Sequence, residues 1–421
     1  MDFKNTLFVL SIVAILSACT SEKEEVKSIY LKNNLSIARV DEPIILKESF
    51  VKKLLVNNEV KNIYFETVDG EKIPFQLDNI NGVKEFSLEC DFKSNEKKQI
   101  IVRTSNNKIE EFKDYTNIRL GKNVDNDGIY QDMKEDVRDP NHLPGAVPVL
   151  YQMEGISWEN DKVGYRSYWD KRNGKDIWGK ITSDMVMDSV GLPNTPSYHE
   201  LQPWGVDVLK VGNSLGAGAL AMIKDGKLFR LGDTNKSTFK IITEGPVRAI
   251  IELDYKGWVV EKDTFNLKQI ITIWKGKYWY QSDVVIEGEN SEDVKLVTGI
   301  TNIALPERKY TQLEEGDETI VYTFGKQTEQ HELMGLALFL NSNKFNKIIE
   351  APNKGNGRTI DGNSPISHTF YTNMKKGNTL SFKFTTGWER SETYFKSAKG
   401  FQGYLVSEVD KLNSPIEISI K

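Results

Sequence analysis

Between residues 248 and 288 the chain reads RAIIELDYKGWVVEKDTFNLKQIITIWKGKYWYQSDVVIEG. Three strand-sized runs stand in this segment, at 248–255, 269–276 and 278–288, and each of them is rich in β-branched or aromatic residues. Similar runs recur from about residue 149 to the C-terminus, the last of them QGYLVSEV at 402–409, with few segments that favour a helix. About a dozen strands in roughly 270 residues predict a large antiparallel β-sandwich. A galactose-mutarotase-like supersandwich is one architecture of this kind.

The N-terminal part of the chain has the same character on a smaller scale. The runs SIYL, PIILK, NIYFETV, EFSLECDF and KQIIVRT are separated by turns rich in Asn, Asp and Gly. We therefore expect a small β-sandwich over residues 28–107. Residues 108–148 are dense in Asp, Asn, Gly and Pro, which predicts an ordered connecting loop. We therefore expect an all-β fold class, with residues 149–421 forming the large sandwich.

The first residues have the features of a bacterial lipoprotein leader. Lys4 precedes an apolar run that ends at Leu16, which is too short to remain as a membrane-spanning helix. The run leads into LSAC, small residues before an acceptor Cys19. We expect residues 1–18 to be a signal peptide, Cys19 to be lipidated and residues 19–27 to be a tether. The lipid would be the only link to the membrane, in the periplasm or at the outer-membrane surface.

Charge and cysteine content narrow the classes of partner and of chemistry. A net charge of −5 argues against nucleic acid as a partner. Once Cys19 is lipidated, Cys90 has no partner for an internal disulfide. The alternating run EFSLECDF around Cys90 indicates a small core residue rather than a nucleophile.

Cations and large rings gather in GYRSYWDKRNGKDIWGK, residues 164–180. Flat aromatic rings suit the C–H faces of sugars, and the guanidinium fork suits carboxylate or sulfate. The segment therefore predicts a cleft for an anionic sugar. The alternative is a sandwich face with core aromatics and a solvated rim of cations. Strand alternation places Tyr165, Ser167 and Trp169 on one face, and Arg166, Tyr168 and Asp170 on the other.

Histidines are scarce, and two of the four flank this region. His199 lies in PSYHELQP and His142 in DPNHLPG, both Pro-bounded loops that can bring a side chain to a site. An imidazole titrates near neutral pH and is a natural general acid or base. We take both as candidates, against the alternative of exposed or structural residues. His331 stands before an apolar strand and is expected to be incidental.

Several familiar motifs are incomplete in this sequence. Pro203 stands where a zinc-binding HExxH motif would need its second histidine, and no Gly-x-Ser-x-Gly is present. GNSLGAGAL has no Gly-Lys-Ser/Thr and indicates a bulge or a close backbone approach. The loop around Asp125–Asp127 resembles an acidic calcium loop without the EF-hand spacing, which allows a structural calcium ion. No other metal or cofactor is expected.

Three long segments carry a family resemblance: WENDKVGYRSYWDKRNGKDIWGK, SYHELQPWGVDVLKVGNSLGAGAL and EGPVRAIIELDY, together with RVDEPIIL and EKIPFQLD near the N-terminus. The chain resembles a bacterial lipoprotein family of unknown-function domains found in polysaccharide-degrading gene clusters. One branch of that family looks like the oligosaccharide dehydratase of ulvan breakdown. The resemblance implies loss of water from a non-reducing-end glucuronic or iduronic acid linked to sulfated rhamnose. The product would be a 4,5-unsaturated uronate.

That chemistry explains why an acidic protein would concentrate cations and rings. Removal of the C5 proton develops a negative charge beside an ionised carboxylate, so the site must stabilise this second negative charge. It also needs a base at C5 and an acid at the departing 4-hydroxyl oxygen. We expect His199 as the base, Tyr168 as the acid and Arg166 on the carboxylate. The supporting residues are Lys210 and Arg248 for the carboxylate, Tyr165 or His142 as a substitute acid, Trp158 and Trp204 for stacking, and Arg172 for the sulfate.

Two other functions remain open from the residues alone. An endo-acting uronate polysaccharide lyase uses the same elimination with a glycosidic oxygen as the leaving group. A non-catalytic glycan-binding surface lipoprotein needs the rings and cations, but has no requirement for His199 or Tyr168.

Overall fold

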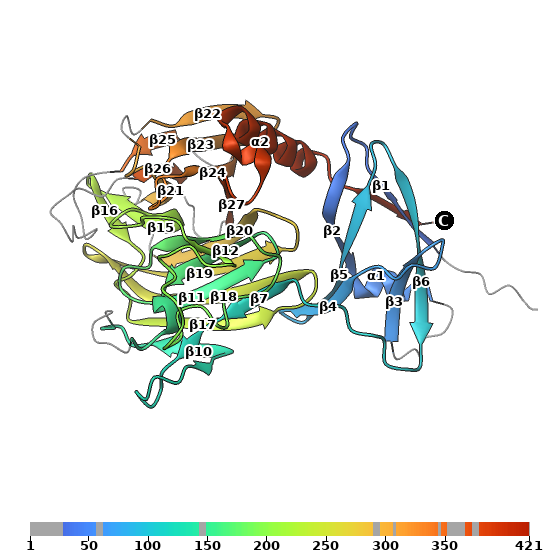
Figure 1. Cartoon of the computed structure of the whole chain (residues 1–421), viewed down its shortest axis with the longest axis horizontal. Coiled ribbons are helices and arrows are strands. Elements are labelled where there is room, and N and C mark those ends of the chain that lie inside the picture. Colours follow the sequence, from blue (N-terminus) through green and yellow to red (C-terminus); the bar gives the residue numbers. More distant parts are fainter. Residues whose placement is uncertain are drawn as a thin grey trace, which may run out of the picture.

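A computed structural model describes residues 28–55, 62–142, 149–288, 295–305, 309–343, 347–351, 367–372 and 379–420. Figure 1 shows a large β unit and a smaller β unit side by side. The sheets are antiparallel throughout their named strands, which confirms the all-β fold class. The segment predicted to be a signal peptide, residues 1–18, and Cys19 lie outside the described residues.

The small unit is a sandwich of two sheets around its own core, which includes Ile29, Phe65, Phe86 and Leu88. Helix α1 (Glu48–Lys52) buries Val51 in the same core. The four-stranded sheet has the order β28 (Glu417–Ile420), β1 (Ser28–Lys32), β6 (Lys97–Ser105), β3 (Asn62–Thr67), and the three-stranded sheet has the order β2 (Arg39–Lys47), β5 (Val83–Phe92), β4 (Phe75–Ile80).

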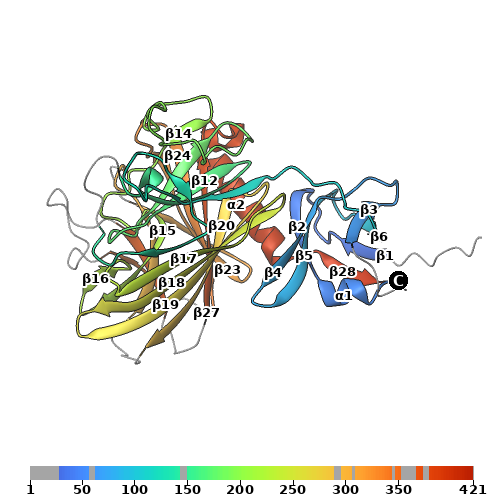
Figure 2. The same ribbon diagram turned by 90° about the horizontal axis from the view of Figure 1, so that it is seen from below.

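The large unit has one nine-stranded sheet, drawn with its strong curvature in Figure 2. The segment 248–288 supplies its centre, because β18, β19 and β20 form two long hairpins. In sheet order the strands are β10 (Glu135–Arg138), β17 (Lys236–Thr243), β18 (Arg248–Val260), β19 (Asp263–Trp274), β20 (Trp279–Gly288), β27 (Thr379–Trp388), β24 (Leu333–Asn341), β23 (Glu318–Lys326) and β22 (Thr311–Glu315).

Two five-stranded sheets form the second layer, because residues of both share one core with the nine-stranded sheet. This is the large sandwich that the strand pattern predicts, in a supersandwich arrangement. One sheet has the order β14 (Gly205–Asp207), β13 (Lys175–Lys180), β12 (Val163–Tyr168), β11 (Gly155–Asn160), β7 (Thr116–Arg119), and the other β16 (Lys227–Arg230), β15 (Ala217–Lys224), β21 (Lys295–Thr301), β26 (Ser367–Thr372), β25 (Lys347–Glu350). A short ladder pairs β8 (Gly121–Lys122) with β9 (Gln131–Asp132).

The C-terminal segment departs from the strand expected there, because QGYLVSEV lies within helix α2 (Ala398–Asn413). Ser397 caps this helix by accepting a hydrogen bond from the Gly400 backbone N–H. Phe401, Leu405 and Val409 are buried, and their spacing of four residues follows one helical face. Figure 1 shows α2 over β22–β24. None of the helices in the described part of the chain has the length and apolar character that a membrane crossing requires.

Two of the expected boundaries differ from the structure. The segment 108–148 is more than a connecting loop, since β7 pairs with β11 and β10 pairs with β17. The last strand, β28, pairs with β1 and so belongs to the small sandwich rather than to the unit expected over 149–421. All three pairings join residues far apart in sequence, which local composition does not encode.

Arg248 joins the two units. It is buried, with Nε 2.7 Å from Asp78 Oδ2, and it also pairs with Glu85. Its backbone N–H donates to Gln76 Oε1 over 3.0 Å. The expected role of Arg248 at a substrate carboxylate therefore needs correction. Two carboxylates of β4 and β5 already balance its charge at the interface.

A second ion-pair group spans the same junction. Lys275 Nζ lies 2.7 Å from Asp41 Oδ1 and 2.5 Å from Glu89 Oε1. Burial raises the pKa of the Glu89 carboxyl to about 8, and its hydrogen bond with Asp41 acts in the same direction. The two carboxylates therefore share one lysine and, near neutral pH, a proton.

We expect Glu89→Gln to raise the melting temperature relative to the unmodified protein by an amount that grows with pH. A carboxyl with a raised pKa favours the folded state in its protonated form. The stabilisation that the protonated Glu89 carboxyl gives to the folded state is complete below pH 4.5 and is lost as the pH rises through about 8. Glutamine keeps the protonated form's hydrogen bonding at every pH. Thermal unfolding across this range measures the effect, with Glu110→Gln as an exposed control, and parallel pH profiles for the two proteins would contradict it.

Candidate functional site

The candidate site lies on the outer face of the β14-β13-β12-β11-β7 sheet, near the loops drawn at the top of Figure 2. Strand β12 alternates as predicted, because Tyr165 is in the core shared with the nine-stranded sheet. Arg166 takes the opposite face and stands directly across from Asp176 of β13. Asp207 of β14 is the next residue along this face, opposite Trp178.

Arg166 is the centre of this group. Its Nη2 donates to Asp207 Oδ2 over 2.9 Å and to Tyr168 Oη over 3.0 Å, and it also pairs with Asp176. The guanidinium lies 4.4 Å from the ring centre of Trp178. Only 2% of the side chain is exposed. Arg166 therefore does not reach a substrate carboxylate, as the sequence suggested, because two aspartates already neutralise it in a buried position.

Tyr168 is held in one orientation by this group. Its Oη donates to Asp176 Oδ2 over 2.7 Å while accepting from Arg166. Burial, reinforced by the Asp176 charge, raises the pKa of the Tyr168 phenol well above its usual value. The phenol therefore keeps its proton at neutral pH, as a general acid must.

His199 meets the same group from the loop that precedes β14. Its Nδ1 lies 3.8 Å from Asp207 Oδ2, and 57% of its side chain is exposed. Burial, with the Asp176 charge next in importance, raises the pKa of Asp207 well above the ordinary value for a carboxyl. The expected convergence of Arg166, Tyr168 and His199 is therefore present in the structure, through the two aspartates between them.

The loop that carries His199 is fixed at its start by a buried ion pair. Lys180 pairs with Glu159, and Glu159 Oε1 accepts the backbone N–H groups of Val186 and Met187 over 2.7 and 2.8 Å. Lys180 Nζ also donates to the Asp184 carbonyl over 2.7 Å. This segment is thereby positioned by buried groups of β11 and β13.

Three functional candidates were missed by the sequence reasoning: Asp176, Asp207 and Glu154. Asp207 in GVDVL and Asp176 in GKDIWG are single carboxylates inside strand-like runs, which was the available signal. Glu154 and Met153 both have positive φ values, 62° and 55°, in the short helix η1 (Gln152–Glu154). Two successive non-glycine residues in this region store strain, which clusters at functional sites.

Arg172 borders the group on its open side. Its guanidinium lies 4.2 Å from the ring centre of Tyr168 and pairs with Asp170 and Glu154. His142 is half-buried in contact with Tyr151, and burial lowers its pKa. The charges that act on His142 are those of Asp170 and Arg172, among others, so it belongs to the Arg172 side of the site.

The remaining sequence candidates fall into two groups. Tyr165 and Trp158 are core residues that stack on each other, and Tyr165 Oη donates to the Tyr278 carbonyl over 2.6 Å. Their expected role in binding substrate is therefore corrected, because neither ring reaches solvent. Trp204 packs on Trp178 with ring centres 6.1 Å apart, and Lys210 is exposed beyond β14.

Among the described residues, no group of three or more His, Cys, Asp or Glu side chains is placed to hold a metal ion. In the acidic loop, Asp127 Oδ1 accepts the Ile129 backbone N–H over 2.8 Å. A calcium ion at Asp125–Asp127 stays a prediction.

Fold and site together define a two-unit, all-β protein with a buried arginine–diaspartate group on an outer sheet. The chain belongs to the family described as "Domain of unknown function (DUF4861)", which matches residues 31–418. It is 23% identical over 296 residues to "Uncharacterized protein P7" of Formosa agariphila, covering 64% of this chain and 67% of that protein.

Two solved structures from Enterococcus faecalis are also similar. One is a protein in the glycosyl hydrolase family 38, with a TM-score of 0.45, 8% identity and coverage of 95% of this chain and 48% of that chain. The other is an alpha-mannosidase, with a TM-score of 0.45, 9% identity and coverage of 94% and 46%. The chain spans about half the length of these enterococcal proteins.

Proposed function

We propose that the protein is an oligosaccharide dehydratase of the ulvan-degrading kind. It would remove water from a non-reducing-end glucuronic or iduronic acid of a sulfated oligosaccharide and leave a 4,5-unsaturated uronate. The observation that supports this most strongly is the meeting of an exposed imidazole and a protonated phenol, His199 and Tyr168, at one buried Arg166–diaspartate group. The reaction needs such a base and acid close together.

The elimination moves one proton from the substrate to the protein and another proton from the protein to the departing hydroxyl. His199 takes the C5 proton, and the C–H electrons form the C4–C5 double bond as the C4–O bond breaks. Tyr168 donates its proton to the departing hydroxyl, which leaves as water. The tyrosinate that results is next to Arg166, whose Nη2 already donates to its oxygen. Solvent then returns the proton from His199 to Tyr168.

Arg172 is the cation best placed for the substrate carboxylate. Its side chain is 24% exposed and lies against the face of Tyr168. Arg172 pairs with Asp170 at 2.6 Å and with Glu154 at 3.2 Å. Because the Glu154 pair is the longer one, an incoming carboxylate would displace Glu154 rather than Asp170 from the guanidinium. Lys210, exposed beyond β14, is the second candidate cation.

The leader supports a location for this activity. Cleavage before Cys19 and its lipidation would hold the enzyme at the periplasmic or outer surface of a membrane, where large glycans are first met. Fatty-acid labelling of the expressed protein tests the anchor, and Cys19→Ser should abolish the label.

The decisive assay is ultraviolet absorbance of the conjugated enol-uronate, followed with product masses. The protein would be mixed with saturated uronate–rhamnose-sulfate oligosaccharides. A rise in absorbance with loss of one water and no shortening supports the dehydratase. A rise with shorter chains would make it an endo-acting lyase, and binding without any rise would make it a glycan-binding lipoprotein.

Tyr168→Phe is expected to lower kcat by about 10- to 100-fold with little change in KM. The ring, its packing against Arg172 and its place in β12 are kept, while the hydroxyl is lost with its transferable proton and its hydrogen bonds to Asp176 and Arg166. The loss is moderate because Tyr168 is half-buried, so water at its accessible edge can also protonate the leaving hydroxyl. Steady-state kinetics measure it, and an unchanged kcat would exclude Tyr168 as the acid.

A further inference from the structure

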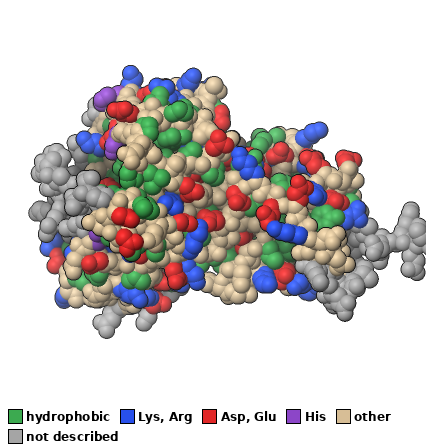
Figure 3. Space-filling view, turned by 60° about the horizontal axis from the view of Figure 1, so that its bottom comes forward, with side chains coloured by type: hydrophobic (Ala, Val, Ile, Leu, Met, Phe, Trp, Pro, Cys, Tyr) green, Lys and Arg blue, Asp and Glu red, His purple; other side chains and the backbone are tan. Residues whose placement is uncertain are grey.

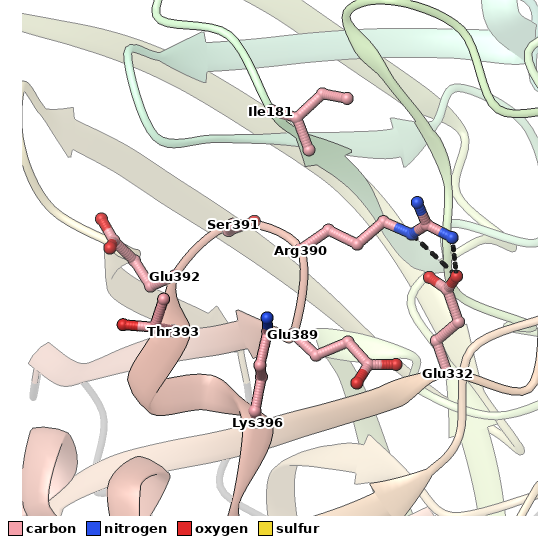
Figure 4. Close-up of a pocket in the computed structure, with 8 residues that line it drawn as sticks. All are labelled: Ile181, Glu332, Glu389, Arg390, Ser391, Glu392, Thr393 and Lys396. Carbon is pink, nitrogen blue, oxygen red and sulfur yellow. Dashed lines mark hydrogen bonds and ion pairs between the residues drawn. The ribbon is translucent and has the colours of Figure 1, made fainter.

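A cavity of about 580 Å³ lies beside the candidate site and is not used by the proposed chemistry. It is formed by the end of β13 and by the segment between β27 and α2, which includes the short helix η2 (Thr393–Lys396). Its volume is within the range of about 300–1,000 Å³ that small-ligand sites occupy. It is lined by Ile181, Glu332, Glu389, Arg390, Ser391, Glu392, Thr393 and Lys396, as Figure 4 shows.

Hydrogen bonds connect this cavity to the His199 group. The backbone N–H of Ile181 donates to the Trp204 carbonyl over 2.9 Å. Gln330 Nε2 donates to the Asp207 carbonyl over 3.0 Å, and Glu332, two residues further, lines the cavity. The cavity wall and the His199 group are therefore held together through Trp204 and Asp207.

The charges in the cavity do not favour an anion. Arg390 is neutralised by Glu332, to which its Nε donates over 2.7 Å. Of the other lining residues, Glu389 and Glu392 carry two negative charges and Lys396 carries one positive charge, which leaves one negative charge in excess. A carboxylate or sulfate placed there would meet this excess, whereas a neutral ligand would not.

The same side chains suit hydroxyl groups. Glu389 Oε1 accepts the Leu333 backbone N–H over 3.0 Å, and Glu392 Oε1 accepts from Tyr278 over 3.3 Å, so each carboxylate is fixed through one oxygen. Their second oxygens can accept from a ligand, while Arg390 and Lys396 can donate. The apolar Ile181 side chain, 44% exposed, borders the same space (Figure 4).

We propose that this cavity binds an uncharged, unsulfated pyranose unit of the oligosaccharide whose uronate is processed at His199 and Tyr168. This rests on the proposed function for its place in the substrate, but the binding itself needs no turnover. The enzyme would thereby select chains in which a neutral sugar lies within reach of the terminal uronate.

Binding of two methyl glycosides that differ only at C6 tests this, using the mature chain and ligand-observed NMR. We expect methyl glucopyranoside to bind with a Kd in the range of about 1–10 mM, and methyl glucuronide about fivefold more weakly. Ile181→Trp fills the opening and should abolish binding of the glucoside. Glu389→Gln with Glu392→Gln should reduce the preference for the neutral glycoside, while Glu110→Gln, exposed elsewhere, should change neither.

The outcomes separate this inference from the dehydratase proposal. Equal or tighter binding of the glucuronide, no detectable binding of the glucoside, or glucoside binding unaffected by Ile181→Trp would each overturn the inference. If the glycosides bind as expected but no unsaturated product ever forms, the sugar-binding cavity is retained and the dehydratase proposal is rejected. If product forms and Ile181→Trp leaves KM unchanged, the dehydratase stands without this subsite.

Discussion

Replacing Arg166 by methionine is expected to lower the free energy of unfolding by about 3–5 kcal/mol. Arg166 pairs with both Asp176 and Asp207. Among the other described cations, only His199 lies near either carboxylate, at a longer distance from Asp207. Methionine fills much of the same space but leaves two buried carboxylates side by side. Urea unfolding of both proteins measures the difference, with the slope against urea checked for a change in the unfolded state.

The neutral version of the same group is the matched control. Adding Asp176→Asn and Asp207→Asn to the Arg166→Met protein should recover much of the loss, because no uncompensated charge then remains. The deficit of the single variant should also shrink at acid pH. Burial already raises the pKa of Asp207, and without the arginine this carboxyl protonates more readily. A loss below about 1 kcal/mol would mean that water reaches these carboxylates and that the group is not buried in solution.

The strands were readable from the sequence because their alternation is local. The run at 248–288 becomes β18, β19 and β20 with core residues at every second position over much of its length. Helix α2 was misread because YLV and its neighbours also fit a short strand, and the decisive feature was the spacing of Phe401, Leu405 and Val409. The pairing of β28 with β1 could not be predicted, since it joins the two ends of the described chain.

The same distinction applies to the site. Alternation correctly put Arg166 and Tyr168 on one face, because it depends on adjacent residues. The sequence could not reveal that Asp207 comes beside Arg166, because that contact needs β14 to pair with β13 across a long loop. Arg166 and Arg248 were therefore taken as open cations, although long-range carboxylates neutralise both. The sequence identifies a cationic residue, but it does not identify the carboxylate that pairs with it in the fold.

His199→Ala is expected to lower kcat for the elimination by about 10²–10⁴-fold, the usual contribution of a positioned general base. The imidazole is exposed and lies 3.8 Å from Asp207, so its removal leaves the Arg166 pairs intact. Stability should therefore change by less than about 0.5 kcal/mol, as for other surface substitutions. Absorbance kinetics and thermal unfolding together separate loss of the base from loss of the fold.

The binding and rescue data decide what His199 does. If His199 is the base, the alanine variant still binds the oligosaccharide with similar affinity, and added imidazole restores part of the rate as its neutral form increases with pH. Glu200→Ala, one residue further on the same exposed loop, is the matched control and should keep full activity. If the His199 variant turns over normally, the proton must leave C5 by another route. If the unmodified protein shows no turnover and the His199→Ala variant binds the oligosaccharide normally, the rings and cations serve glycan binding alone, because that function uses no base.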